Sequence, residues 1–210
     1  TIGAHSTVVI LGVVGGILGA LVRSGLDDPS DAMVMFVVAL PLWLLSGVGI
    51  RATPGDLAVA LAIVGVFGFL SRAMGSASVA GMLTGMLVAL LAIVAGGYGW
   101  FAVLIAFFGI GAIATKFRYE EKQARNAAEP NQGARGTGNV LANSSVALVA
   151  VLGFAASPNF AIDPDLFVFA FTGSLATAMS DTLSSEIGVL FGEPRLITSF
   201  EPVPVGTDGG

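Results

Sequence analysis

The stretch "AMGSASVAGMLTGMLVALLAIVAGGYGWFAVLIAFFGIGAIAT" (residues 73–115) carries no charged side chain. A helix that crosses the hydrocarbon core of a bilayer needs about 20 consecutive apolar residues. The stretch is therefore long enough for two spans. Its "GGYGW" segment (96–100) supplies a tight turn between them, with Tyr98 and Trp100 suited to the membrane interface. The segment predicts two transmembrane helices joined by a short connection.

The flanking sequence extends this pattern in both directions. Residues 32–50 and 136–162 also lack charged side chains, and the whole chain is 55% hydrophobic and 11% charged. Soluble proteins average about 25% charged residues. The composition therefore predicts an all-α fold, a polytopic bundle of transmembrane helices.

We expect about seven spans, separated by segments rich in charge, proline or glycine. They are placed at 6–22, 32–50, 56–71, 78–96, 99–115, 143–157 and 165–181. Three regions follow from this placement. Residues 1–115 hold five hydrophobic spans, residues 116–142 form a basic and glycine-rich loop, and residues 143–210 hold two further spans with the motifs described below.

The distribution of basic residues predicts the orientation of the bundle. If the loops alternate along these spans, one side receives only Arg51. The other side receives Arg23, Arg72, Lys116, Arg118, Lys122, Arg125, Arg135 and Arg195. Cytoplasmic loops carry an excess of Lys and Arg. We therefore expect the loop 116–142 and the segment after residue 181 to be cytoplasmic, and the integral membrane chain to present its motifs to that compartment.

Charge and residue usage exclude several function classes. The chain has nine Lys and Arg against fourteen Asp and Glu, and nucleic-acid binding requires a basic face. No nucleic-acid partner is expected. The chain has no cysteine, which excludes disulfides, thiolate nucleophiles and cysteine metal sites, and a lone His5 argues against a histidine-rich metal site.

The segment "GARGTGN" (133–139) within the basic loop is a candidate anion site. A glycine-rich turn before a helix N-terminus, here around Gly136, offers free N–H groups to an anion. If a helix begins near Arg135, then Arg135, Asn139 and Asn143 fall on one stripe at i, i+4 and i+8. A guanidinium and two amides on one face suit phosphate or nucleotide oxygens. The alternative is a membrane-flanking loop that sets topology and contacts anionic head groups.

The segment "SDTLSSEIG" (180–188) places two carboxylates after an uncharged run. Either the helix ends at Ser180 and Asp181 caps a new short helix, or the helix continues and carries Asp181 and Glu186 at membrane depth. On one straight helix the two acids lie about 140° apart. A single metal ion held by both would need a break in the helix, whereas Mg²⁺ needs few carboxylates besides water and phosphate, so Asp181 alone suffices as its protein ligand.

The segment "EPVPVGTDGG" (201–210) is the third candidate. Pro202 and Pro204 favour an extended approach to the turn. The turn itself contains Gly206, Thr207, Asp208, Gly209 and Gly210. Successive glycine N–H groups can form a concave anion site, so the three segments together predict phosphate binding at one membrane face.

These motifs resemble a known family. "GARGTGNVLAN", "GSLATAMSDTLSSEIG", "PRLITSFEPVPVGTDGG" and the upstream "ATK" resemble the integral-membrane family of transmembrane protein 19 and plant phytyl-phosphate kinase. The pattern "SDTLSSEIGVLFG…VPVGTDGG" is similar, more distantly, to CTP-dependent polyprenol kinases and CDP-diacylglycerol synthases. The resemblance covers roughly residues 105–210.

The resemblance implies a membrane enzyme that transfers a phosphoryl group from a nucleoside triphosphate, CTP or ATP, to a prenyl monophosphate of phytyl or geranylgeranyl type. Asp181 would be the Mg²⁺-binding acid, with Glu186 beside it as a catalytic candidate. Such catalysis consists mainly of positioning and charge neutralisation. The prenyl tail would lie among the apolar spans in the bilayer, while Lys116, Arg118 and Lys122 are candidates to receive its phosphate.

The resemblance also assigns the phosphate-binding groups. Arg135, Asn139 and Asn143 would fall in the family's signature loop, and Gly206, Thr207 and Gly210 in its phosphate-binding turn. The chain departs from the family pattern at Ser144, where a glycine is expected. It also stops directly after "GTDGG", so we expect a fragment of a longer protein.

Two function classes compete with the kinase. A lipid or small-molecule transporter or scramblase would show paired repeats and polar groups near the bilayer midplane. The first five spans carry almost no buried ionisable residue, and the polar motifs gather at one face, which favours an interfacial enzyme. A non-enzymatic membrane protein, whose glycines only shape loops, leaves the placement of Asp181 unexplained.

Overall fold

The computed structural model describes residues 2–25, 29–50, 52–191, 194–204 and 207. This part of the chain is an all-α bundle without β-strands. Its long helices are α1 (Ile2–Gly25), α2 (Asp31–Ser46), α3 (Pro54–Ala73), α4 (Val79–Gly96), α5 (Tyr98–Lys116), α7 (Thr137–Ala156) and α8 (Pro164–Gly188). The short helix α6 (Tyr119–Ala124) and the 3₁₀ turns η1 (Asn131–Gly133) and η2 (Ser157–Asn159) complete the described elements.

Local capping chemistry explains where several helices begin. The Ser30 and Ser78 side chains accept hydrogen bonds from the third residue of α2 and of α4. Thr53 and Asp56 form a reciprocal capping box at the start of α3, with Pro54 in the first turn. Gly97 joins α4 to α5 with a φ of +94°, a conformation that favours glycine. The turn predicted at 96–100 is confirmed.

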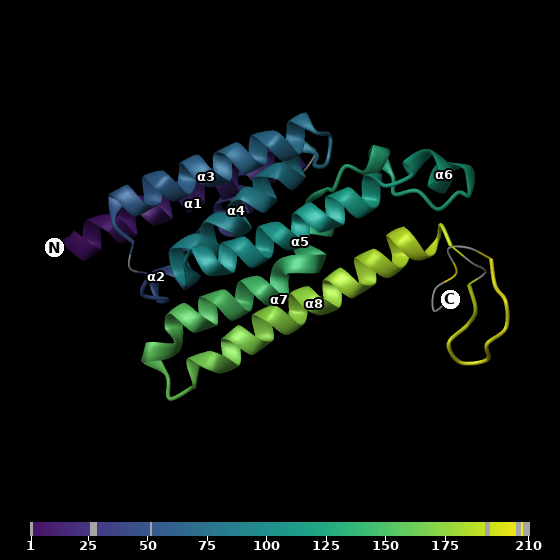
Figure 1. Cartoon of the computed structure of the whole chain (residues 1–210). Helices are drawn as coiled ribbons and strands as arrows, with labels where there is room; N and C mark the ends of the chain where they lie inside the picture. Colours follow the sequence, from purple (N-terminus) through teal and green to yellow (C-terminus); the bar gives the residue numbers. More distant parts are fainter. Residues whose placement is uncertain (1, 26–28, 51, 192–193, 205–206, 208–210) are drawn as a thin grey trace.

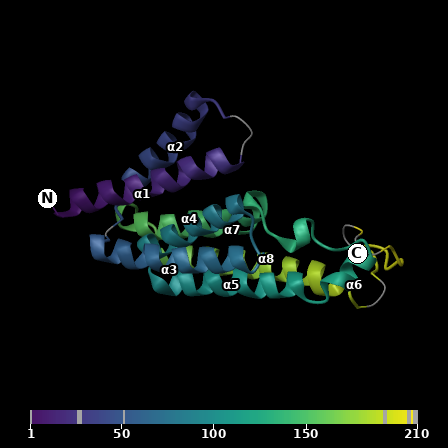
Figure 2. The same ribbon diagram turned by 90° about the horizontal axis from the view of Figure 1, so that it is seen from above.

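Helix α4 lies at the centre of the bundle. It packs against α1, α3, α5 and α7, and nine of its 18 residues are buried. The last helix, α8, packs against α7 and α5 (Figure 1). Helices α1 and α2 lie together on one side of the others, where α2 packs mainly on α1 (Figure 2).

Six of the described helices are long and apolar enough to cross a membrane: α1, α3, α4, α5, α7 and α8. The prediction of a polytopic helical bundle is confirmed. Helix α2, predicted as a span over 32–50, is shorter and has 16 residues. Large apolar side chains such as Trp43, Phe69 and Phe169 stand exposed on the outside of the bundle, as expected for surfaces that face lipid.

Two helix boundaries near the motifs differ from prediction. Helix α7 begins at Thr137 rather than 143, so Asn139 and Asn143 both lie within it. Helix α8 runs without a break to Gly188, well beyond the predicted end at 181. The question posed by "SDTLSSEIG" is thereby answered: the helix continues, and Asp181 caps no new helix.

One end of the bundle gathers the chain segments that carry the motifs. The ends of α3, α5 and α8, the starts of α4 and α7, helix α6 and the C-terminal segment all lie there, whereas the connection between α7 and α8 lies at the opposite end (Figure 1). Arg72, Lys116 and Arg135 therefore lie at one end, as alternation of the spans predicts.

Candidate functional site

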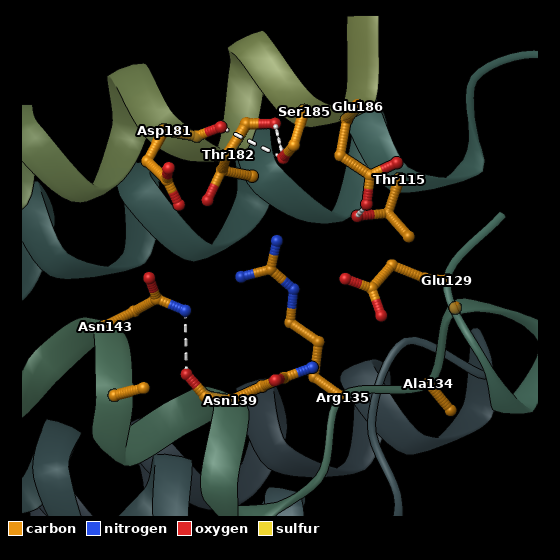
Figure 3. Close-up of a pocket in the computed structure, with 12 residues that line it drawn as sticks. Thr115, Glu129, Ala134, Arg135, Asn139, Asn143, Asp181, Thr182, Ser185 and Glu186 are labelled. Carbon is orange, nitrogen blue, oxygen red and sulfur yellow. Dashed lines mark hydrogen bonds between the residues drawn. The ribbon is translucent and has the colours of Figure 1, made fainter. Parts of the chain in front are cut away.

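A polar cavity of about 260 Å³ opens at this end between α5, α7, α8 and the loop before α7 (Figure 3). Side chains with oxygen or nitrogen atoms dominate its lining. They are Thr115, Glu129, Arg135, Asn139, Asn143, Asp181, Thr182, Ser185 and Glu186. Two of the three predicted candidate segments, 133–139 and 180–188, thus contribute to one site, although they lie far apart in the sequence.

The backbone of Arg135 is clamped between two parts of the chain. Its N–H donates to Ser76 O (2.9 Å), and its carbonyl accepts from Ser78 N–H (3.0 Å). A Cβ atom at Gly81, in the first turn of α4, would lie 2.1 Å from that same carbonyl oxygen. Close approach of α4 to the loop therefore requires a glycine at position 81, and the start of α4 holds the Arg135 backbone in place.

The guanidinium of Arg135 points into the cavity towards α8 (Figure 3). A Cβ atom at Gly111 would lie 2.8 Å from its Nη2 atom, so α5 leaves just enough space for the planar group. Its Nη1 atom is buried and has no hydrogen-bond partner among the described residues. A buried donor without a partner is costly and is typical of a site that receives a ligand or water.

Burial lowers the pKa of Arg135 below its ordinary value, whereas the nearby Glu186 and Glu129 carboxylates act in the opposite direction. Because the pKa of a guanidinium starts so high, the group stays cationic at neutral pH. Arg135 therefore brings into the cavity a positive charge and a donor that no described residue engages.

The two predicted amides lie on α7 beside Arg135. Asn143 Nδ2 donates to the backbone oxygen of Asn139 (2.8 Å). This bond leaves the side-chain oxygen Oδ1 of Asn143 available to accept a hydrogen bond. Helix α7 begins at Thr137, so Arg135 lies before the helix. Of the three residues predicted to share a helical stripe, only Asn139 and Asn143 are therefore helical. The three side chains nevertheless line one cavity. Gly136 is the residue before the first turn of α7 and does not line the cavity.

Asp181 and Glu186 of α8 both line the cavity, but in different environments. Asp181 is exposed, and its carboxylate makes no hydrogen bond or ion pair with the described residues. Glu186 is buried, with 5% of its surface exposed. A separation of about 140° around the helix places one acid at the accessible side of the cavity and the other in the protein interior.

Glu186 is engaged by the buried Lys122 of α6. Lys122 Nζ lies 2.6 Å from Glu186 Oε2, and Thr115 Oγ1 lies 2.6 Å from Glu186 Oε1. Lys122 also donates to Ala114 O (2.8 Å) and Thr115 O (2.9 Å), two carbonyls in the last turn of α5. The expectation that Lys122 receives a substrate phosphate is corrected, because all three of its N–H bonds already have protein acceptors.

Lys116 lies outside the cavity lining. Its exposed Nζ atom donates to Gly75 O (3.1 Å) and Gln132 O (3.3 Å), so it ties the connection before α4 to the loop before α7. The cation that the structure brings into the cavity is Arg135. The role of Lys116 in receiving phosphate stays a prediction.

The C-terminal motif contributes little to the described site. Gly206, Gly209 and Gly210 lie outside the described residues. Thr207 is described, and its Oγ1 atom donates to Pro204 O (2.7 Å). It is exposed and does not line the cavity. The phosphate-binding role of this motif stays a prediction.

Four polar residues of the cavity were not predicted from the sequence as site residues: Thr115, Glu129, Thr182 and Ser185. A signal existed for two of them, since Ser185 shares a helical stripe with Asp181 and Thr182 shares one with Glu186. Thr115 is part of the "ATK" segment. No sequence pattern distinguishes Glu129 from the other acids of its loop.

The donor set suits a hard cation held together with a ligand. Within the described ranges no group of three or more Asp, Glu, His or Cys side chains lies close enough to enclose a metal ion. Mg²⁺ is usually bound through one or two carboxylates, with water and substrate phosphates completing its shell. The Asp181 carboxylate, which has no partner within the described ranges, lies in a polar cavity and fits this mode of binding.

Comparison with known proteins places these observations in context. Residues 62–210 match the family described as "Integral membrane protein DUF92". "Protein VTE6, chloroplastic" of Arabidopsis thaliana is 35% identical over 133 residues, which is 63% of this chain and 40% of that protein. No solved structure matches the chain.

Two further relatives also match the chain over part of their length. An uncharacterized membrane protein of Methanocaldococcus jannaschii is 37% identical over 118 residues, 54% of this chain and 44% of that protein. "Protein PGR" of Arabidopsis thaliana is 32% identical over 162 residues, 72% of this chain and 56% of that protein. The matched regions thus span about half the length of the curated relatives.

Proposed function

The chain belongs to the DUF92 family of integral membrane proteins, and from this membership we propose that it is a membrane-embedded prenyl-phosphate kinase. In this proposal the enzyme transfers a phosphoryl group from CTP or ATP to a prenyl monophosphate of phytyl or geranylgeranyl type. The family match includes every residue that lines the polar cavity. The membership agrees with the resemblance drawn from the motifs.

One observation carries the proposal. Arg135 Nη1 and the Asp181 carboxylate, neither of which has a partner in the part of the chain that the structure describes, line the same cavity at the end of a membrane bundle. A guanidinium recognises phosphate oxygens, and a carboxylate holds the divalent ion that accompanies them. Phosphoryl transfer needs little else from the protein than such positioning and neutralisation of charge.

The size of the cavity suits phosphate groups. At about 260 Å³ it is smaller than most sites that enclose a whole organic ligand, which measure roughly 300–1,000 Å³. The prenyl tail would therefore lie outside it, along helices whose outer faces carry exposed apolar side chains such as Val146 and Val149 of α7. A membrane-dissolved substrate with an anionic head fits both features.

The proposed reaction assigns roles to the chain's own residues. An oxygen of the prenyl monophosphate attacks the γ-phosphorus, the bond between that phosphorus and the bridging β–γ oxygen breaks, and the nucleoside diphosphate leaves with the electron pair. Arg135 donates hydrogen bonds to the oxygens that gain charge, and the Asn139 and Asn143 amides orient the phosphates. Mg²⁺, held by Asp181, would neutralise charge on the transferring phosphate.

The experiment that tests the proposal uses the full-length protein in liposomes with γ-labelled CTP or ATP. Label is expected to move onto phytyl or geranylgeranyl monophosphate, and omission of Mg²⁺ should stop the transfer. Absence of labelled diphosphate with either nucleotide and either lipid would contradict the proposal. Passage of labelled lipid phosphate across sealed liposomes without any nucleotide would instead favour a transporter.

A further inference from the structure

Lys122 has no donor left for a ligand. Its side chain has no exposed surface, and Nζ donates to Glu186 Oε2, Ala114 O and Thr115 O. An ammonium group has three N–H bonds, and each has an acceptor here. Any contribution of this residue to the site must therefore pass through the groups that it holds.

The carboxylate that Lys122 holds is equally engaged. Glu186 Oε2 accepts from Lys122, and Glu186 Oε1 lies 2.6 Å from Thr115 Oγ1. The Thr115 hydroxyl also lies 3.0 Å from Gly111 O, but the shorter contact with the carboxylate is charge-assisted and is the one expected to take the proton. Both oxygens of Glu186 thus already accept a hydrogen bond.

This arrangement leaves an arginine and a carboxylate close together but not bonded to each other. Glu186 lies near enough to Arg135 to interact with its charge, and both line the cavity. A guanidinium and a carboxylate in such proximity ordinarily form a two-pronged ion pair. Here the Arg135 Nη1 atom has no partner among the described residues.

We propose that Lys122 and Thr115 are positioning residues that hold Glu186 away from Arg135 and so keep the guanidinium available to a phosphate oxygen. The inference rests on the part of the proposed function in which Arg135 binds phosphate, and it does not require that transfer occurs. Without Lys122, the Glu186 carboxylate would turn to Arg135 and compete with the anion. The buried ion pair then serves ligand binding as well as stability.

The proposal predicts an asymmetry that a purely structural ion pair would not produce. Lys122→Met frees the carboxylate, which closes on Arg135. Glu186→Gln also breaks the ion pair, but it removes the Glu186 carboxylate as a competitor for Arg135, whereas Glu129, which also lies near Arg135, is the same in both variants. If the pair only supports the fold, both substitutions should affect ligand binding alike, because each leaves one buried partner uncompensated.

The test measures binding of inorganic pyrophosphate with Mg²⁺ to the detergent-solubilised full-length protein by calorimetry. Lys122→Met is expected to weaken the affinity about tenfold or more, the value of a charge-assisted hydrogen bond. Glu186→Gln and the double variant Lys122→Met/Glu186→Gln should stay within about threefold of the wild type. Arg72→Met removes an exposed positive charge at the end of α3, outside the cavity lining, without freeing Glu186, and it serves as the control.

If Lys122→Met does not elute as a folded protein, two less disruptive variants at Thr115 test the positioning role instead. Thr115→Val removes one of the two donors to Glu186, and Thr115→Ser keeps it. The valine variant should bind pyrophosphate more weakly than the serine variant. Equal affinities for this pair, or equal affinities for Lys122→Met and Glu186→Gln, would overturn the proposal.

Arg135→Ala separates this inference from the proposed function. If the wild type and Arg135→Ala bind pyrophosphate equally well, Arg135 is not the anion site and both the proposed function and the inference fail. If Arg135→Ala loses binding while Lys122→Met and Thr115→Val retain it, Arg135 binds the anion and only the positioning role is wrong.

Discussion

Gly111 of α5 lies directly against the guanidinium of Arg135: a Cβ atom at position 111 would stand 2.8 Å from Nη2. The contact is with the far end of a flexible side chain, so a larger residue at 111 would move the guanidinium rather than the fold. Helix α5 thus sets where the positive charge of the cavity lies.

Gly111→Ala is expected to weaken phosphate binding without a large loss of stability. The added methyl group displaces the Arg135 guanidinium, and a shift of this kind misplaces a donor that needs accurate geometry. We expect the affinity for pyrophosphate to fall several-fold, by roughly 1 kcal/mol. Calorimetry checks the expected loss of affinity, and thermal unfolding of the same preparation checks that the stability is retained.

Gly81→Ala, in contrast, should lower the stability of the fold. Its Cβ atom would lie 2.1 Å from the Arg135 carbonyl oxygen, which belongs to the backbone and cannot turn away. Overpacking of this kind costs about 1–3 kcal/mol, so the melting temperature should fall clearly. A Gly81→Ala protein as stable as the wild type would show that the start of α4 does not clamp the loop.

Asp181→Asn is expected to abolish kinase activity while leaving expression and folding normal. The substitution keeps the shape of the side chain but removes the charge proposed to hold Mg²⁺, and we expect a loss of about a hundredfold or more. Asp165→Asn, an exposed acid in the first turn of the same helix α8, is the matched control. An active Asp181→Asn enzyme would exclude Asp181 from the mechanism.

Lys116 and Lys122 should differ sharply in their importance for stability. Lys122→Met removes a buried ion pair and two buried hydrogen bonds, which costs about 3 kcal/mol. Lys116→Met removes two hydrogen bonds at the exposed surface, which contribute about 1 kcal/mol at most. Thermal unfolding in detergent should therefore show a much larger drop for Lys122→Met. Equal melting temperatures would contradict the buried ion pair.

The orientation of the bundle can be tested with single cysteines, since the chain contains none of its own. Ala124→Cys lies at the end where the basic residues gather, and Ala161→Cys lies in the connection at the opposite end; both positions are exposed. A membrane-impermeant thiol reagent is expected to label Ala124→Cys from the cytoplasm and Ala161→Cys from outside. The reverse pattern would overturn the orientation inferred from Lys and Arg.

Hydropathy and charge were sufficient to predict the transmembrane helices and the end of the bundle at which the motifs lie. A run such as 73–115 has no soluble alternative for its apolar side chains, so the helices at α4 and α5 follow from composition alone. The alternation of basic loops likewise brings Arg135 and the end of α8 to one face. These features depend on the sum of many residues, and each residue contributes little to the result.

The roles of individual polar residues depended on packing between segments. Lys116 and Lys122 look equivalent along the chain, but α6 turns Lys122 inward to Glu186 and leaves Lys116 at the surface. Asp181 and Glu186 are both acids of α8, but only Asp181 stays unpaired among the described residues. Whether a charge is free or neutralised depends on its neighbours across a few ångströms, and these neighbours come from segments that only folding brings together.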